Sequence, residues 1–376
     1  MPFAAALSEH PLPAEAAGEV LGQILESLPA EPDLAVLFAT APMTGALEDV
    51  VGAVHAVLRP RTLIGSTAVS VLAGGQEVEE TTALTLWAGT TGPATPVRLE
   101  AVQGLDDTVI GGLPDDIAPG STLVLLTDPF TFPADAVLPD LAASGVTVIG
   151  GLASAARGPG GNRLILDQRL HEDGAVGVLL PPDRAVVPLV SQGCRPLGEP
   201  MIVTKSERNI VYELAGKPAL ERVLDLAAAA SPDERALMQA GLHVGIVVDE
   251  AKDTFERGDF LVRGVLGADR SNGAVAIGQE VEVGTTIQFH VRDAGTADED
   301  LREMLGASGT ADGALVFSCN GRGTNLFGRP HHDAELVAEI THGRCAGMFC
   351  AGEIGPVGRR SFLHGFTASV ALFRED

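Results

Sequence analysis

The chain has little of what marks secreted, membrane-spanning or disulfide-stabilised proteins. Only four of its 376 residues are cysteines, and all but the last two lie far apart, so we expect reduced thiols. The first 25 residues hold no lysine or arginine, which argues against a signal peptide. No apolar run approaches the roughly 20 residues that cross a bilayer. These absences predict a cytoplasmic protein.

Positive charge is also scarce. The chain has 25 lysines and arginines against 50 acidic residues, which gives a formal net charge of −25. Such a charge repels the phosphates of nucleic acids and the surfaces of anionic membranes. We therefore expect neither nucleic acid nor membrane as a partner.

What the chain has instead is apolar residues, 45% of the total, arranged in a pattern that occurs four times. Each copy has an apolar strand, usually a helix, a second strand that ends in glycine and small residues, and a third strand. In the third copy the connection between the first two strands is too short for a full crossover helix. The expected strands, three for each copy in chain order, are 34–40, 62–68 and 83–89; 122–128, 147–154 and 174–180; 243–249, 261–269 and 285–291; and 313–319, 346–355 and 364–373.

This pattern predicts the fold class. A strand, helix, strand order favours a parallel pair, and a hairpin-linked third strand runs antiparallel. We therefore expect an α/β to α+β fold of mixed sheets layered with helices, in two domains built from four related β(α)β-β units. A helical extension is expected over 1–31, a first domain over 32–216 and a second over 217–376.

Several phrases of the sequence resemble the FIST family, over roughly residues 34–373. They are VIGGLAS (148–154), GAVGVLL (174–180), SQGCRPLGEPMIVTKSERNIVYELAGKPALE (191–221), VFSCNGRGTNLFG (316–328), AGMFCAGEIGPVG (346–358) and FLHGFTASVALF (362–373). The resemblance implies a FIST N-terminal and a FIST C-terminal domain. It also implies an intracellular sensory role with small ligands such as amino acids, rather than a defined reaction.

A polar, glycine-rich segment directly follows the predicted strand 313–317. Ligands of α/β proteins usually bind at such carboxyl ends of strands. The segment's members are Cys319, Asn320, Gly321, Arg322 and Gly323. Its glycines allow a close approach to a ligand, and the planar fork of the arginine matches a carboxylate or phosphate. A structural salt bridge is the alternative for this arginine.

Equivalent strand ends should converge, because 351–355 occupies the same place in its copy as 65–68, 150–154 and 267–270. This convergence would bring Ser154 and Glu353 to the same site. Glu353 is flanked by apolar and glycine residues, so if buried it needs a cation or an amide donor, such as Arg322 or a ligand ammonium. A purely structural ion pair is the alternative.

Two further residues complete the predicted ligand site. Arg195 precedes a proline, which favours an extended backbone that projects its side chain; alternatively, it braces the interface between the domains. His364 could act with Cys319 and Glu353 as base, nucleophile and orienting acid. A buried cysteine more often packs as a small hydrophobe, so we expect these residues to bind a ligand and not to catalyse a reaction.

Other patterns are interpreted as structural. The glycine-rich run lacks the spacing of a phosphate loop, and the C-x4-C pair of Cys345 and Cys350 has no second pair to complete a metal site. We therefore expect no cofactor and no metal. The acidic runs 77–80 and 298–300 are interpreted as solvated surface.

The sequence therefore predicts an intracellular sensory protein that binds amino acids or small carboxylates without catalytic activity. Since no kinase, chemotaxis or F-box segment is recognised, two alternatives stay open: output through a separate signalling protein, or no signalling at all. A Cys-dependent hydrolase or transferase is the second hypothesis, and a protein-docking scaffold is the third.

Overall fold

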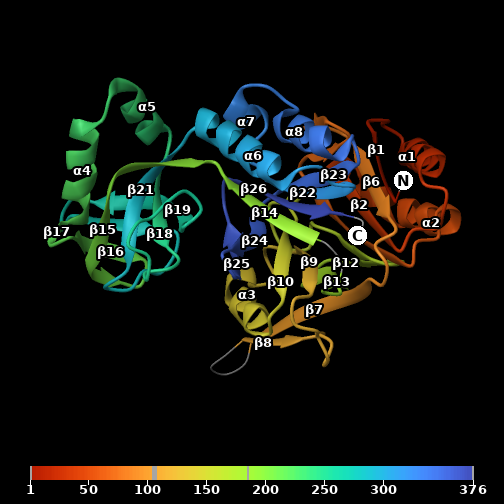
Figure 1. Ribbon diagram of the computed structural model, residues 1–376, viewed down its shortest axis with the longest axis horizontal. Coiled ribbons are helices and arrows are strands. Elements are labelled where there is room, and N and C mark those ends of the chain that lie inside the picture. The colour runs from red at the N-terminus through yellow and green to blue at the C-terminus, as the bar shows by residue number, and fades with distance from the viewer. Residues whose placement is uncertain (1, 104–107, 184–185, 375–376) are drawn as a thin grey trace. The chain divides into compact units, whose positions relative to one another are not determined.

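The computed structural model describes residues 2–103, 108–183 and 186–374, and the chain divides into two compact lobes (Figure 1). The first lobe holds Met1–Ser191, Leu301–Leu363 and Thr367–Asp376. The second lobe holds Gln192–Asp300 and His364–Phe366. The second lobe is therefore almost entirely an insertion into the chain of the first.

Three of the four predicted repeats form the first lobe, each centred on its own mixed sheet. The first sheet has the order β1 (Phe3–Ser8), β6 (Leu84–Gly89), β2 (Leu34–Thr40), β3 (Thr62–Ala68), β11 (Leu164–Leu166) and β12 (Arg169–His171). The second has the order β25 (Arg360–His364), β24 (Glu353–Val357), β10 (Thr147–Leu152), β9 (Thr122–Thr127), β13 (Ala175–Leu180), β7 (Thr95–Gln103) and β8 (Thr108–Gly111). The third has the order β14 (Val186–Gln192), β26 (Thr367–Phe373), β22 (Gly313–Cys319), β23 (Cys345–Cys350), β4 (Val71–Ala73) and β5 (Gln76–Val78).

The pairing inside these three repeats is the predicted one. The first and second strands of each repeat run parallel, as β2–β3, β9–β10 and β22–β23. The third strand lies antiparallel on the other side of the first, as β6, β13 and β26. The first strands are buried on both faces, which explains why they read as continuous apolar runs.

The three repeats are joined in a cycle by the short strands that follow each second strand. After β3 the chain adds β4 to β23, after β23 it adds β24 to β10, and after β10 it adds β11 to β3. Because each repeat adds a short strand to the sheet of another repeat, the ends of the three second strands lie close together. The amide of Leu152 donates to Gly352 O at 2.9 Å, and that of Ala351 donates to Leu152 O at 3.0 Å.

The inner faces of the three sheets share one apolar core, and the helices of the lobe cover the outer faces. Phe38 of β2 meets Phe317 of β22 edge to face in the shared core, with ring centroids 6.3 Å apart. Separate outer clusters lie beneath the helices. These helices are α1 (Pro13–Ser27), the 3-10 helix η1 (Ala41–Ala46), α2 (Leu47–Val57), α3 (Ala134–Ala143), α8 (His332–Thr341) and the part of α6 (Ala294–Ser308) from Leu301 onward. The short helix α7 (Thr324–Phe327) lies between β22 and α8 in the chain.

The second lobe is a closed ring of strands. Its order is β15 (Cys194–Glu207), β21 (Thr286–Arg292), β18 (Leu242–Val247), β19 (Phe260–Asp269), β20 (Ala274–Ile277), β16 (Ile210–Leu214) and β17 (Lys217–Pro218). The long strand β15 closes the ring because it pairs with both β21 and β16. Helices α4 (Ala219–Ala229) and α5 (Pro232–Ala240) precede β18.

The third repeat, which lies in this lobe, corrects one prediction. Its strand order is again third, first, second, as β21–β18–β19, but β18 and β19 pair antiparallel and not parallel. The connection 248–259 contains turns and no helix, so the chain returns as a hairpin. The strand end 267–270 is exposed, unlike the three converging strand ends of the first lobe.

The first 31 residues hold more than the expected helix. Helix α1 is preceded by β1, which pairs antiparallel with β6 at the edge of the first sheet. Phe3 in this strand stacks on Trp87 with ring centroids 5.1 Å apart, so the segment belongs to the core of the lobe. Within the described ranges, no helix is both long enough and apolar enough to span a membrane.

Candidate functional site

The predicted glycine-rich segment lies at the carboxyl end of β22. Asn320 is exposed, and its amide donates to Cys350 O, so the segment starts beside the end of β23. Gly323 has φ +56° and ψ −140°, a conformation almost confined to glycine, and a Cβ there would lie 2.7 Å from a Glu79 oxygen. The glycine therefore allows the chain to turn inward at Arg322.

Arg322 is fully buried and forms an ion pair with Asp333 at the start of α8. Its Nε and Nη2 donate to the two carboxylate oxygens at 2.7 and 2.8 Å. Two of the guanidinium donors are therefore taken by a protein carboxylate, as in the structural salt bridge that the sequence argument gave as the alternative to a ligand contact. The remaining nitrogen, Nη1, is buried without a hydrogen-bond partner.

Asp333 is the ionised member of the site. Burial by itself would raise the pKa of its carboxyl, but the Arg322 guanidinium and the donors from His332 and Ser318 hold that pKa well below its usual range. Ser318 Oγ donates at 2.7 Å and His332 Nδ1 lies 2.9 Å away. Asp333 is a residue that the sequence argument did not predict, because its pairing with Arg322 depends on where α8 packs against the strand end.

Glu77 corrects the interpretation of run 77–80 as solvated surface. Its side chain is 3% exposed, and its oxygens accept from the amides of His331, Asp333 and Ala334 at the start of α8. Burial first, and then the nearby Asp333, raise the pKa of Glu77 to about 7. Glu79 likewise accepts from the Thr324 amide. The sequence argument was wrong here because Glu77 and Glu79 contact a distant part of the chain, namely the start of α8 and Thr324.

The second acidic run needs the same correction. Asp300 in the second lobe is 8% exposed, and its Oδ2 accepts from the Gln192 amide at 2.7 Å. Only the middle residue of this run, Glu299, is exposed. In both runs, long-range contacts and not composition decide which acids meet water.

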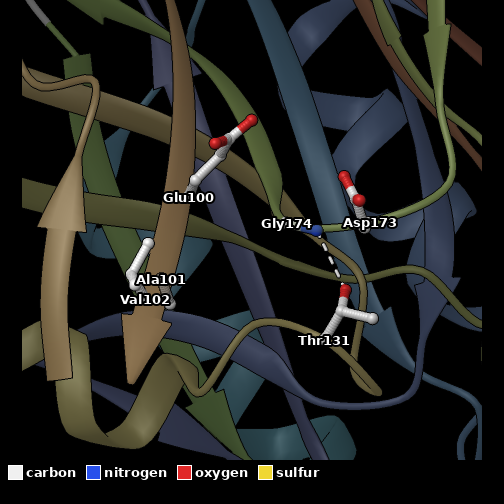
Figure 2. Close-up of a pocket in the computed structure, with 6 residues that line it drawn as sticks. All are labelled: Glu100, Ala101, Val102, Thr131, Asp173 and Gly174. Carbon is white, nitrogen blue, oxygen red and sulfur yellow. Dashed lines mark hydrogen bonds between the residues drawn. The ribbon is translucent and has the colours of Figure 1, made fainter. Parts of the chain in front are cut away.

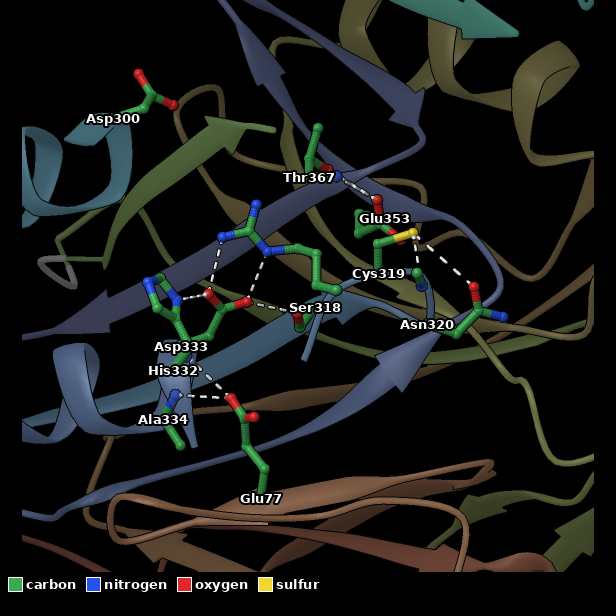
Figure 3. A network of polar contacts seen from close by, with 12 residues as sticks. Glu77, Asp300, Ser318, Cys319, Asn320, His332, Asp333, Ala334, Glu353 and Thr367 are labelled. Atoms are coloured by element: carbon green, nitrogen blue, oxygen red, sulfur yellow. Dashed lines mark hydrogen bonds and ion pairs between the residues drawn. The ribbon is translucent and has the colours of Figure 1, made fainter. Parts of the chain in front are cut away.

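Glu353 is fully buried at the start of β24 (Figure 3). Its Oε2 accepts from the amide and the hydroxyl of Thr367 at 3.1 and 2.9 Å, whereas Oε1 is buried without a hydrogen-bond partner. Burial is the main reason why the pKa of this carboxyl is raised to about 8, and Thr367, Cys319 and Arg322 only partly oppose it. Glu353 is thus mostly a neutral acid near pH 7.

Two thiols flank this acid. Cys319 is 6% exposed, accepts from the Gly321 amide at 3.4 Å, and its sulfur lies beside the Glu353 carboxyl (Figure 3). Cys350 is fully buried, and burial first, then the nearby Glu353, raise the pKa of its thiol. All four cysteines of the chain are thiols and not disulfides.

Ser154 also lies at the converging strand ends, where its hydroxyl is used by the backbone. It donates to Phe349 O and accepts from the amide of Val69 at 3.0 Å. The residue thus fastens the end of one repeat to β23 of another. Its role as a ligand contact stays a prediction.

The other two predicted residues belong to the second lobe. Arg195 on β15 donates to Asp293 at 3.1 Å and to Glu234 at 3.2 Å. His364, at the end of β25, is 4% exposed. Seven of the nine predicted residues therefore lie at the strand ends of the first lobe. The other two, Arg195 and His364, belong to the second lobe.

A second cluster of buried titratable groups lies in the second lobe. His243 on β18 and His290 on β21 are direct partners across the two strands and are 4% and 2% exposed. Their rings contact Phe366 and Phe260 respectively. Burial lowers the pKa of each imidazole to about 4, with Arg292 also lowering that of His243. Both histidines are therefore neutral near pH 7.

A hollow of about 260 Å³ lies at the second sheet, away from these clusters (Figure 2). It is lined by Glu100, Ala101, Val102, Thr131, Asp173 and Gly174. None of the nine predicted site residues lines it. Among the residues that the structure describes, no three or more histidine, cysteine or acidic side chains are grouped as they would be to hold a metal ion.

Comparison with known proteins accounts for nearly the whole chain. A model of the FIST N domain matches residues 33–217, and a model of the FIST C domain matches residues 219–356. A protein of Mycobacterium bovis is 43% identical over 371 residues, covering 96% of both chains. A protein of Mycobacterium tuberculosis is 42% identical over 368 residues, covering 96% of this chain and 95% of its own. Both relatives are described only as uncharacterized proteins.

Proposed function

The chain belongs to the FIST family, whose domains are associated with sensory roles in signal transduction, and we propose that it binds a small molecule at the carboxyl ends of β22 and β23. The proposed ligands are amino acids or small carboxylates. The proposed binding residues, all in the first lobe, are Cys319, Asn320, Gly321, Arg322, Gly323, Glu353 and Ser154. The protein would signal through its ligand-bound state to a separate signalling protein, without catalysing a reaction.

One observation carries this proposal. Arg322 Nη1 and Glu353 Oε1 are both buried polar atoms that lack a hydrogen-bond partner among the residues that the structure describes. Leaving a buried polar group without a partner costs about 1–3 kcal/mol. Both atoms belong to side chains around Cys319, next to the exposed Asn320 and Ala351 at the ends of β22 and β23. A ligand that enters there can supply both missing partners.

The protonation of the acids supports binding over catalysis. A cysteine nucleophile needs a base that accepts its proton. The carboxyl beside Cys319 is Glu353, whose pKa of about 8 leaves it protonated near pH 7. The ionised Asp333 is held by both donors of the Arg322 fork, so it has little freedom to act as a base.

Access to the strand ends provides the test. Ala351 is exposed, so Ala351→Phe should obstruct the approach without altering the buried network. Thermal-shift screening of amino acids, primary amines and short carboxylates should find compounds that raise the Tm of the wild type. Titration should then show at least about tenfold weaker binding to Ala351→Phe, a loss of roughly 1.4 kcal/mol.

The matched control is Ala228→Phe on the exposed side of α4 in the second lobe, which should bind like the wild type. Equal affinity for all three proteins would place the ligand elsewhere. The absence of any hit at millimolar concentrations of these three compound classes would contradict the proposed function itself.

A Cys-dependent hydrolase or transferase is the second candidate, because Cys319 lies at the strand end beside the exposed Asn320 and its sulfur accepts a hydrogen bond from the Gly321 backbone amide. Alkylation by iodoacetamide, followed by peptide mass spectrometry between pH 6 and 9, tests it. Fast alkylation of Cys319 below pH 7 would favour this candidate. The deeply buried Cys345 and Cys350 serve as internal references for thiols that do not react.

A further inference from the structure

The surroundings of Glu353 limit what its free oxygen can bind. Thr367, at the start of β26, supplies both donors that hold Oε2. On the opposite side, β10 places Gly151 directly across from Glu353 in the ladder, and the Cys350 side chain fills the space beside that glycine. Oε1 is therefore the unsatisfied oxygen of a buried carboxyl whose other oxygen is held by Thr367.

Few charged or titratable groups face this carboxyl. The ends of β22 and β23 contribute the thiols of Cys319 and Cys350, and the segment after β22 contributes the Arg322 guanidinium. Arg322 is neutralised by the bidentate pair with Asp333 and cannot balance a second carboxylate fully. Among the described residues, an ionised Glu353 therefore has no counter-ion of its own.

The net charge of the whole chain also favours a ligand that carries a positive charge. A formal net charge of −25 attracts cations and repels anions at long range. A simple carboxylate would have to approach against this field and would then lie beside an acid without gaining a free cation. A ligand that brings its own positive charge would supply the counter-ion that Glu353 lacks.

We infer that the ligand of this site carries a primary ammonium group that binds Glu353 Oε1, and that binding displaces the proton of this carboxyl into solution. The inference rests on the proposed function of the same site. In the exchange, the neutral acid and the aqueous ammonium become a carboxylate–ammonium ion pair, and one proton passes to the buffer. An amino acid fits this requirement, with Arg322 Nη1 left to donate to its carboxylate.

Proton release gives the inference a direct readout. Because the pKa of Glu353 stands at about 8, the free site is mostly protonated at pH 7, and nearly one proton should leave for each ligand bound. Affinity should rise about tenfold from pH 6 to pH 7, since binding competes with this proton. A ligand without an ammonium group should show neither effect.

The experiment uses matched pairs of probes, namely L-alanine with propionate, L-leucine with 4-methylpentanoate and L-glutamate with glutarate. Each pair is titrated calorimetrically into the full chain at pH 6 and pH 7, in phosphate and in Bis-Tris, a tertiary amine, because the different ionisation enthalpies of the two buffers reveal released protons. The amino acid of a pair is expected to bind at least tenfold more tightly than its deamino analogue. Only the amino acid should release protons.

Glu353→Gln should weaken the binding of the amino acid at least tenfold and abolish proton release, while its amide oxygen can still accept from Thr367. Glu335→Gln, which removes an exposed carboxylate from α8, is the matched control and should behave like the wild type. The wild-type titrations stand even if Glu353→Gln fails to fold.

The outcomes separate the two proposals. If the deamino analogues bind as tightly as the amino acids, or binding releases no proton, the ammonium inference is overturned while the binding site stands. If no probe of any class binds, the proposed function is overturned, and the inference with it.

Discussion

Burial shifts the pKa values of titratable side chains in opposite directions in the two lobes, upward for acids in the first and downward for histidines in the second. In the first lobe burial raises the pKa of Glu353 to about 8 and that of Glu77 to about 7, so near pH 7 the first is mostly and the second about half protonated. In the second lobe burial lowers the pKa of His243 and His290 to about 4, so both are neutral near pH 7. Burial therefore shifts the groups of both lobes toward their uncharged forms.

Asp333 is an exception, because this buried carboxyl stays ionised. It is as deeply buried as Glu353, yet it stays ionised because Arg322 lies against it with two charge-assisted hydrogen bonds. Burial therefore sets the protonation of an isolated group, and a dedicated counter-ion reverses it. The comparison implies that each cluster should weaken folding at a different end of the pH scale.

Removing the one ionised acid should have the largest effect. Asp333→Asn leaves the Arg322 charge buried without a counter-ion, so the free energy of unfolding should fall by about 3–5 kcal/mol, measured by urea denaturation at pH 7. Asp293→Asn removes a partner of Arg195 whose side chain is 23% exposed, and it should cost less than about 1 kcal/mol.

A further variant separates charge from packing at the same position. Replacing both partners, as Arg322→Met with Asp333→Leu, should recover much of the loss, because no buried charge then remains. Equal losses for Asp333→Asn and Asp293→Asn would mean that the buried pair contributes no more than an exposed one.

The neutral acid should produce the next largest effect, at alkaline pH. Since the pKa of Glu353 rises from 4.5 to about 8 on folding, the folded state binds more protons in this range. Stability should therefore fall as the pH rises from about 4.5 through 8. Relative to pH 5, Glu353→Gln at pH 9 should gain on the order of 3 kcal/mol over the wild type in urea denaturation.

The control for this series is Glu335→Gln, whose pH profile should follow that of the wild type, because this side chain is exposed. Glu77, with a pKa of about 7, contributes a similar decline that Glu353→Gln leaves in place. Parallel profiles for Glu353→Gln and the wild type would show that the buried carboxyl does not take up a proton on folding.

The histidines should produce the smallest effect, at acidic pH. Their pKa falls from 6.5 to about 4 on folding, so the unfolded state binds more protons in this window. Stability should be fully present above about pH 6.5 and decline toward pH 4. His290→Gln should remove on the order of 2 kcal/mol of this decline.

His342→Asn, at an exposed position with φ +52°, is the matched control, since asparagine tolerates this conformation. Denaturant midpoints at pH 4.5 and pH 7 for the three proteins decide the matter. If His290→Gln loses as much stability on acidification as the wild type, the acid response comes from other groups.

The candidate site was predictable only in part. The carboxyl end of an apolar strand and the glycines around Arg322 identified the segment 319–323, and the repeat placed Ser154 and Glu353 near it. The partners were not predictable, because Asp333 meets Arg322 through the approach of α8 to the strand end. Glu77 is a clearer case: its acidic neighbours suggest a surface, and only the pairing of β4 with β23 buries it.

The sequence by itself determined the local elements of this protein, because alternating and continuous apolar runs decide where strands form and which faces they bury. It also determined the four repeats and the parallel pairs wherever a crossover helix is long enough. Only the tertiary structure decided the cyclic exchange of strands among three repeats, the antiparallel pairing of the third and the protonation of the buried groups. These depend on contacts between distant segments, and a residue's own sequence neighbours hold no information about the burial and counter-ions that such contacts create.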